Sequence, residues 1–132
     1  MIDVSIHKES RYSVSSKVIR STVQDFLKNQ GIKGRAEVGV SVVGDRKMKD
    51  LNKKYAQKDE TTDVLSFGLE EGPGFITPPD GILRLGDVVI SYPQTVRNAA
   101  ENNVLVEEEI QTLIKHGLNH LLGVHHEEES RI

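Results

Sequence analysis

The amino-acid sequence predicts an α+β fold, with a single mixed β-sheet of about four strands and helices packed mainly on one face of it. Two observations support this prediction. Apolar residues alternate with polar ones in several short segments, and they recur with a helical period in the segments between them. The segments follow the order strand, helix, strand, helix, strand, strand, helix, helix, with no internal repeat. The length of 132 residues suggests a single domain over 1–132.

The first half of the chain is expected to form two strands and two helices. Alternating apolar residues predict strands over 1–7 and 35–43. Serines at the start and an apolar face predict a helix over 13–30, which Gly31 closes. Asp45 is expected to be the N-cap of a short helix that ends at residue 54 or 55.

The second half is expected to begin with a strand over 61–67, followed by a loop over 68–81 that holds four glycines and three of the four prolines. A near-continuous apolar run predicts that the strand over 82–91 is central in the sheet. Gly86 and Asp87 indicate a bulge or kink within it. Ser91 is expected to cap a helix over 92–102, which ends at Asn103.

The last predicted helix, over 104–122, carries a cluster of histidines. Four of the five histidines of the chain lie within residues 116–126. His116 and His120 are four residues apart, so they are expected to lie one above the other on one face, roughly 5–6 Å apart at Cβ. Two imidazoles at that spacing can reach one metal ion at about 2.0–2.1 Å each.

A third ligand has to come from beyond the helix. Gly123 is expected to end the helix, so that the chain can turn and carry His126 back toward the pair. His125 is the competing third ligand, and the spacing favours His126. The resulting pattern, His-x-x-x-His-x-x-Gly-x-x-His, is the ligand spacing of the metzincins, except that Gly117 stands where those enzymes have their general-base glutamate.

These ligands predict a zincin-like three-histidine metal site. Three neutral imidazoles with an open fourth position are typical of catalytic zinc, and the chain has no cysteine for a closed structural site. The missing glutamate argues against ordinary peptidase chemistry. The competing interpretation is a surface helix that carries histidines without binding a metal.

Composition limits the classes of function. The net charge of −3 disfavours stable non-specific binding of nucleic acid. No apolar run is long enough to span a membrane and no secretory signal is visible, so cytoplasmic residence is expected. The densest positive charge is on the helix that starts at Asp45. It is interpreted either as a solvated helix face or as a surface for phosphate backbone, and it comprises Arg46, Lys47, Lys49, Lys53, Lys54 and Lys58.

Three blocks of the sequence resemble the YbeY family of bacterial rRNA-maturation endoribonucleases. The first is His116-Gly117-Leu118-Asn119-His120-Leu121-Leu122-Gly123-Val124-His125-His126, which is similar to the family signature His-Gly-x-Leu-His-Leu-x-Gly-Tyr-Asp-His. The second is the run from Leu51 to Phe67, and the third is Gly86-Asp87-Val88-Val89-Ile90-Ser91. The resemblance spans about residues 35 to 128, with the blocks in the family's order.

This resemblance implies a metal-dependent endoribonuclease that selects single-stranded RNA. Its role would be maturation of the 3′ end of 16S rRNA in the small ribosomal subunit, together with ribosome quality control. His116, His120 and His126 would hold one ion per chain, usually taken as zinc. The sequence does not predict the oligomeric state.

One departure from the family concerns the RNA phosphate. The resemblance implies an arginine directly after the aromatic Tyr55, and this chain has Ala56 there. Lys53, Lys54 or Lys58 can substitute as point charges, although none matches the two-pronged contact of a guanidinium.

The catalytic residues are expected to be His116, His120 and His125. Besides His125, Asp59 and Asp63 are the nearest candidates for proton transfer or for orienting a ligand. For Asp63 a structural role is favoured, at the end of a strand or paired with a lysine, and Asp87 is similar.

Two other functions are compatible with the sequence. One is a metal-dependent hydrolase of another bond, such as a peptide or amide, which the missing glutamate disfavours. The other is a ribosome-assembly factor with a structural metal, whose basic face over 47–58 docks on RNA or on a ribosomal protein. A chelator separates them, because it abolishes catalysis but not docking through lysines.

Overall fold

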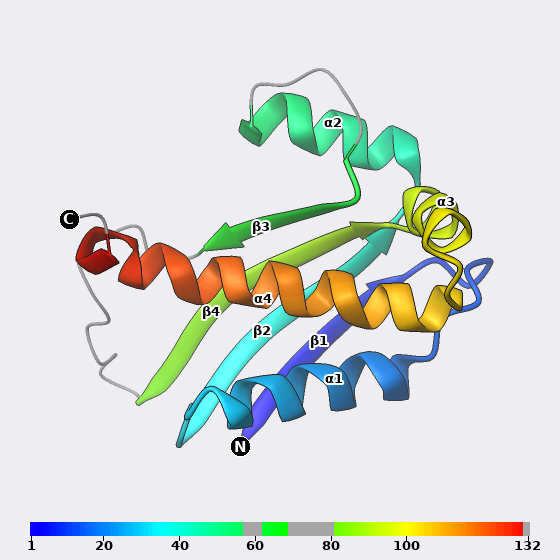
Figure 1. Ribbon diagram of the computed structural model, residues 1–132. Helices are drawn as coiled ribbons and strands as arrows, with labels where there is room; N and C mark the ends of the chain where they lie inside the picture. Colours follow the sequence, from blue (N-terminus) through cyan, green and yellow to red (C-terminus); the bar gives the residue numbers. More distant parts are fainter. Residues whose placement is uncertain (57–61, 69–80, 131–132) are drawn as a thin grey trace.

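The computed structural model describes residues 1–56, 62–68 and 81–130, and for residues 56 and 124–130 it describes the backbone alone. The elements of this part follow the predicted order (Figure 1). They are β1 (Ile2–Lys8), α1 (Ser16–Asn29), β2 (Arg35–Val43), α2 (Asp45–Ala56), β3 (Val64–Gly68), β4 (Ile82–Ser91), α3 (Tyr92–Asn102) and α4 (Val106–Ser130). None of the helices, so far as they are described, is long and apolar enough to cross a membrane.

The strands form one mixed sheet in the order β1-β2-β4-β3. β1, β2 and β4 are parallel, and β3 runs antiparallel to β4. β4 therefore lies between two strands, as its near-continuous apolar sequence predicted. The parallel strands β1 and β2 are connected through α1, and the connection from β2 to its parallel neighbour β4 includes α2 and β3.

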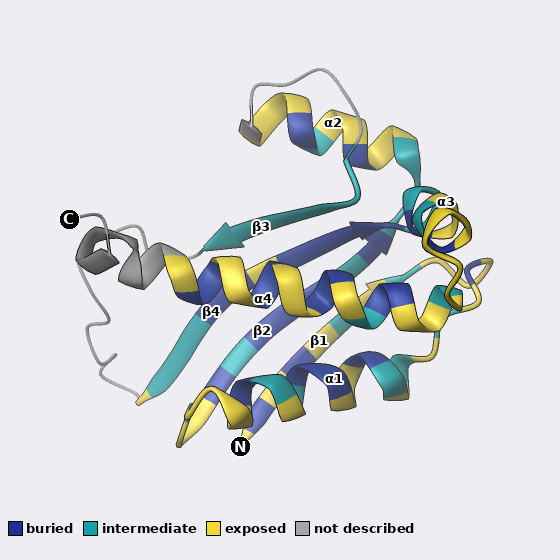
Figure 2. Cartoon of the chain, in the orientation of Figure 1, coloured by how far each residue is buried: buried dark blue, intermediate teal, exposed yellow. Residues whose placement is uncertain are grey.

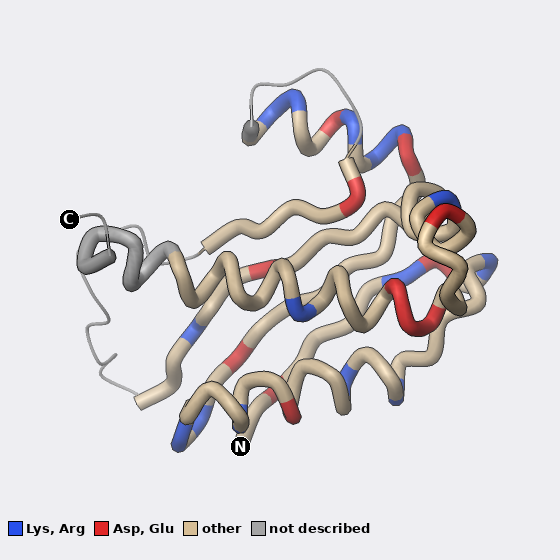
Figure 3. Tube along the Cα trace, viewed as in Figure 1, with Lys and Arg blue, Asp and Glu red and all other residues tan. Residues whose placement is uncertain are grey.

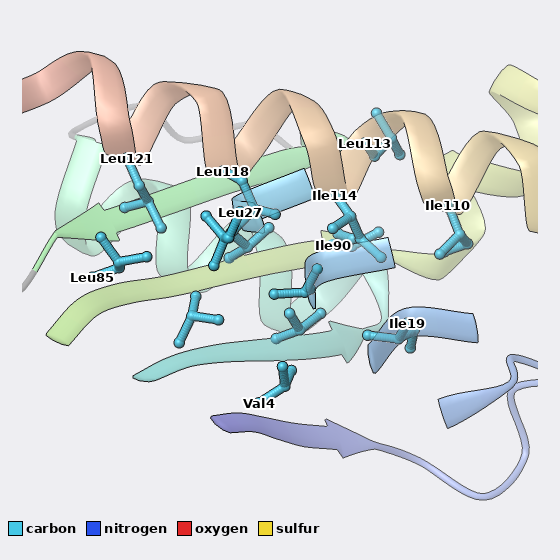
Figure 4. Packing of buried hydrophobic residues seen from close by; sticks show 14 of the residues in the cluster. Val4, Ile19, Leu27, Leu85, Ile90, Ile110, Leu113, Ile114, Leu118 and Leu121 are labelled. Atoms are coloured by element: carbon cyan, nitrogen blue, oxygen red, sulfur yellow. The ribbon is translucent and has the colours of Figure 1, made fainter. Parts of the chain in front are cut away.

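Helices α1 and α4 cover one face of the sheet (Figure 1), and they contact each other as well as the strands. The alternating residues of β1 and β2 and one side of each helix are buried between them (Figure 2). Figure 4 shows the aliphatic side chains of α4 directed at the strands. This layer is the hydrophobic core, with Ile110, Ile114, Leu118 and Leu121 from α4, Ile19 and Leu27 from α1, and Val40, Leu85 and Ile90 from the sheet.

Helices α2 and α3 begin where β2 and β4 end, at one edge of the sheet. Ser91 ends β4 and caps α3, since its Oγ accepts a hydrogen bond from the Gln94 amide at 3.2 Å. The same Oγ donates to the Asp45 carboxylate at 2.9 Å. Arg97 adds two hydrogen bonds to that carboxylate, at 3.0 and 3.1 Å. Asp45 was predicted to be the N-cap of α2, but it is the first residue of the helix, since the Met48 amide donates to the Gly44 carbonyl. Its side chain ties α2 to α3.

The predicted irregularity in β4 is a bulge. Glu37 of β2 pairs with Arg84, but Val38 pairs with Gly86, so Leu85 is an extra residue. Gly86 has φ +127°, and a Cβ there would collide with the Phe67 carbonyl oxygen of β3. Glycine is required at this position both by the backbone angle and by the close approach of β3.

The outer edge of β1 is capped by side chains of α1. The Met1 carbonyl accepts from the Ala36 amide of β2, so the carbonyls of Ile2 and Val4 point away from the sheet. Gln24 donates to the Ile2 carbonyl at 3.1 Å, and Arg20 donates to the Val4 carbonyl at 3.5 Å.

The predicted end of α4 at Gly123 is wrong, because the helix continues to Ser130. Gly123 is exposed, and it does not have the positive φ that a left-handed helix end would give it. A glycine inside a helix costs only about 0.5–1 kcal/mol, which is too little to end a helix on its own. In contrast, Gly31 and Asn103 have φ +83° and +56° and do close α1 and α3 as predicted.

The other boundaries differ by a few residues. Ser15 is the N-cap of α1, and its Oγ accepts from the Val18 amide at 3.2 Å. β3 starts at Val64 rather than at 61, since Val64 is the first residue that pairs with β4. Most of the predicted loop over 68–81 lies outside the described residues.

Candidate active site

The two histidines that were predicted to pair lie on α4. His116 and His120 are both exposed, and they are one helical turn apart. Between them Gly117 and Leu118 are buried against the sheet. The two histidines therefore lie beside the buried side of α4 and are themselves open to solvent, so a ligand can reach both imidazoles.

The third ligand stays a prediction. The side chains of His125 and His126 lie outside the described residues. Among the side chains that are described, no three His, Cys, Asp or Glu residues are grouped so that they could hold a metal ion. Residues six positions apart on a continuous helix differ by roughly 120° around its axis. A ligand at 126 would therefore require the chain to leave the helix after His120.

Helix α4 approaches the sheet closely at Gly117. A Cβ at this position would lie 2.6 and 3.1 Å from the two Cγ atoms of Val88 on β4. It would also lie 3.3 Å from the Ser66 Oγ on β3, and that hydroxyl donates to the Gly117 carbonyl at 3.0 Å. No side chain fits at 117 unless the helix or the Val88 side chain moves, so the packing disfavours the glutamate of the metzincin pattern at this position.

The basic surface predicted on α2 is present. Arg46, Lys47, Lys49, Lys53 and Lys54 are exposed, and Figure 3 shows the positive charge along this helix. Met48 and Asn52 are buried on its other side. Lys58, and the side chain of Ala56, lie outside the described residues.

Tyr55 also belongs to this surface, although no role was predicted for its side chain. It is 56% exposed, and its ring packs against Phe67 of β3 with ring centroids 5.0 Å apart and planes at 64°. The Lys54 Nζ lies 5.2 Å from the centroid of the same ring. An aromatic residue directly after two lysines was the signal in the sequence that could have identified it.

Of the acidic residues considered in the sequence, Asp63 and Asp87 contact neighbouring elements of the fold. The Asp63 carboxylate accepts from the Asn98 side chain at 3.1 Å, and its carbonyl accepts from the Ser91 amide at 2.9 Å. Asp63 therefore joins β3 to β4 and α3, as its structural interpretation predicted, although the partner is an amide and not a lysine. Asp87 lies over Gly39, where a Cβ would collide with its Oδ1. Asp59 lies outside the described residues.

Together these features place the chain among α+β proteins with a mixed sheet and a packed helix that bears a His-x-x-x-His pair. The family model described as Endoribonuclease YbeY matches residues 3–132. The chain belongs to this family.

Individual relatives agree with this assignment. An Endoribonuclease YbeY from Dehalococcoides mccartyi is 39% identical over 96% of this chain and 84% of its own length. One from Moorella thermoacetica is 37% identical over 92% of this chain and 81% of its own. One from Roseiflexus castenholzii is 33% identical over 96% and 80%.

A solved structure has the same fold. The solution structure of TM1509 from Thermotoga maritima aligns with a TM-score of 0.59 and 25% identity, over 93% of this chain and 73% of that one. The four-stranded mixed sheet and its helices are thus shared with an experimentally determined protein.

Proposed function

We propose that this chain is a metal-dependent endoribonuclease that cleaves single-stranded RNA, with His116, His120 and His126 as the metal ligands. The observation that supports the proposal is the exposed His116–His120 pair on α4 in a chain that belongs to the Endoribonuclease YbeY family. Endoribonucleases hydrolyse phosphodiester bonds, so the enzyme is a hydrolase that acts on RNA.

The residues present suit a zinc ion. Zinc binds imidazole nitrogens without any cysteine, and three of them leave a position for substrate. When bound, the ion would supply a Lewis acid for a phosphate oxygen and lower the pKa of a coordinated water. His116 and His120 are held in place because Gly117 fixes this turn of α4 on β3 and β4.

The remaining chemistry falls to other side chains of this protein. Lys53 and Lys54 are exposed on α2 and would bind the RNA phosphates as point charges, with Lys58 as a further candidate. His125 is proposed to move a proton at the scissile phosphate. Asp63 is not proposed for this role, because its carboxylate is already held by Asn98.

The proposed substrate in the cell is the 3′ end of 16S rRNA in the small ribosomal subunit, which places the enzyme in the cytoplasm. The net charge of −3 supports a transient encounter rather than tight non-specific binding. The charged contacts would then be concentrated on α2, whose lysines are exposed and whose basic positions are blue in Figure 3.

The test is cleavage of a short single-stranded RNA by the purified protein, beside a His120→Ala variant and a chelated sample, with the zinc content of each measured. We expect cleavage by the zinc-loaded wild type alone. An RNA duplex of the same sequence is the substrate control and should stay intact. Absence of bound metal from the wild type would refute the proposed site.

A second variant, Ala56→Arg, asks whether the missing arginine limits the rate. A positioned hydrogen-bond donor that stabilises charge in a transition state contributes about 10²–10³ in rate. Bound zinc with weak cleavage, raised by Ala56→Arg but not by Ala56→Leu, would show that the site is intact and the phosphate contact is missing.

The alanine at 56 also supports a second candidate, a ribosome-assembly factor whose metal is structural and whose lysine face docks on RNA. That protein would bind single-stranded RNA equally well with and without chelator and would cleave none of it. Cleavage that is lost on chelation would favour the metal-dependent endoribonuclease over the assembly factor.

A further inference from the structure

Tyr55 is an exposed aromatic side chain at the end of the lysine-bearing surface. Among the described residues the large hydrophobic side chains that are exposed are few, and Tyr55 is the aromatic one. The other tyrosines pack together, since Tyr12 stacks on Tyr92 with centroids 4.6 Å apart. A single exposed aromatic side chain is common on protein surfaces, so the case for a function at Tyr55 rests on the residues around it.

The ring of Tyr55 is held in place rather than free. Phe67 supports it in an edge-to-face contact, and the Lys54 ammonium lies near the ring. An aromatic pair of this geometry stabilises the orientation of both rings. A planar group can therefore stack on the exposed part of Tyr55 without the ring first having to be ordered.

The neighbours of Tyr55 connect it to the candidate active site. Phe67 follows Ser66 on β3, and consecutive strand residues point to opposite faces of a sheet. Ser66 is bonded to Gly117 of α4, next to His116, whereas Phe67 contacts Tyr55 of α2. The histidine pair and Tyr55 thus lie on two sides of one strand, and β3 is the last strand in the sheet order.

We propose that Tyr55 is a base-stacking residue that binds one nucleobase of single-stranded RNA as the strand crosses the edge of β3 toward His116 and His120. This proposal rests on the endoribonuclease function proposed above. An unpaired base exposes its ring face, whereas a base in a duplex is already stacked, so the contact selects single strands. Lys53 and Lys54 would bind the phosphates on either side of that nucleotide.

The test uses the absence of tryptophan from the chain. Tyr55→Trp introduces a single tryptophan, which can be excited selectively, at the proposed stacking position. Leu105→Trp, at a residue 69% exposed between α3 and α4, is the matched control. Titration with a short single-stranded RNA should quench the fluorescence of Tyr55→Trp and leave that of Leu105→Trp unchanged. Equal responses from the two variants would overturn the proposal.

Affinity supplies the second measurement, made with chelated protein and labelled RNA so that nothing is cleaved. Stacking energies predict that Tyr55→Ala weakens binding about 5- to 150-fold, whereas Tyr55→Phe stays within about twofold of wild type. An RNA with one abasic position should weaken wild-type binding where the stacked base is removed, and Tyr55→Ala should no longer respond to that position.

The two proposals fail in different ways. Unchanged RNA affinity in Tyr55→Ala, together with normal cleavage by the wild type, refutes base stacking and leaves the endoribonuclease function standing. A wild type that neither binds nor cleaves single-stranded RNA refutes both. Circular dichroism of Tyr55→Ala, with Tyr55→Phe beside it, checks that the fold is retained.

Discussion

Replacing Gly117 by alanine should destabilise the protein, although the same change in most helices is stabilising. The new Cβ would lie 2.6 Å from a Val88 methyl, whereas carbon atoms in contact are about 3.5–4.0 Å apart. Either the helix or the buried Val88 side chain must therefore move by about 1 Å. Such overpacking costs about 1–3 kcal/mol.

Two further effects nearly cancel. Lifting α4 breaks the hydrogen bond from Ser66 to the Gly117 carbonyl, which contributes about 1 kcal/mol. Alanine gains about 1 kcal/mol over glycine in helix propensity. The net expectation is a loss of about 1–3 kcal/mol in the free energy of unfolding, measured by urea denaturation of the metal-free protein.

Gly123→Ala is the matched control, because it makes the same substitution on the same helix at a position with nothing within 4 Å. It should stabilise the protein by about 0.5–1 kcal/mol. In the background Val88→Ala the cost of Gly117→Ala should shrink, with a coupling energy of about 1–3 kcal/mol. If Gly117→Ala were as stable as Gly123→Ala, the close approach of α4 to β4 would be refuted.

Three other variants test separate parts of the structure. Gly86→Ala should lower the free energy of unfolding by more than about 3 kcal/mol, because it combines backbone strain at φ +127° with a collision with the Phe67 carbonyl. Gly34→Ala is the control, also at positive φ but with nothing within 4 Å, and it should cost clearly less. Asp45→Ala should cost about 1–2 kcal/mol, because it removes the acceptor for Ser91 and a partly exposed ion pair with Arg97; a loss no larger than that of Asp50→Ala would contradict this role. Gly123→Ala should weaken zinc binding while it stabilises the metal-free protein, because a helix that continues through 123 opposes the turn needed to bring His126 to the metal. Isothermal titration calorimetry with zinc measures the affinity, and an unchanged affinity would mean that the chain need not turn at 123.

The fold was predictable from the sequence because its local signals agree with each other. Alternation in β2 and the apolar run of β4 predicted both strands with the bounds that the structure has, and Ser91 and Asn103 marked both ends of α3. Each of these signals acts within a few residues, through a cap or a buried face, so no knowledge of the tertiary structure is needed.

The candidate site was less predictable, because Gly117 acts through contacts far along the chain. In the sequence Gly117 stood out only because a glutamate was missing there. In the structure the absence of a side chain at 117 lets Val88 and Ser66 pack directly against the backbone of α4. The indication was present in the helical pattern, since a glycine occupies a sheet-facing position between Ile114 and Leu118.

The end of α4 was predicted wrongly at Gly123 for a related reason. A glycine permits the left-handed turn that ends many helices but does not impose it, and the outcome depends on what the following residues bind. For a ligand such as His126 that partner would be a metal ion, which the sequence pattern implies but local propensity does not include.

The caps on β1 have a consequence for the behaviour of the protein at high concentration. An edge strand with bare carbonyls is a template onto which another chain can add a strand, and this is a common start of aggregation. Gln24 and Arg20 occupy the acceptors that such a strand would use. One side of α1 therefore closes the hydrophobic core, and other residues of the same helix oppose the addition of a fifth strand at the edge of β1.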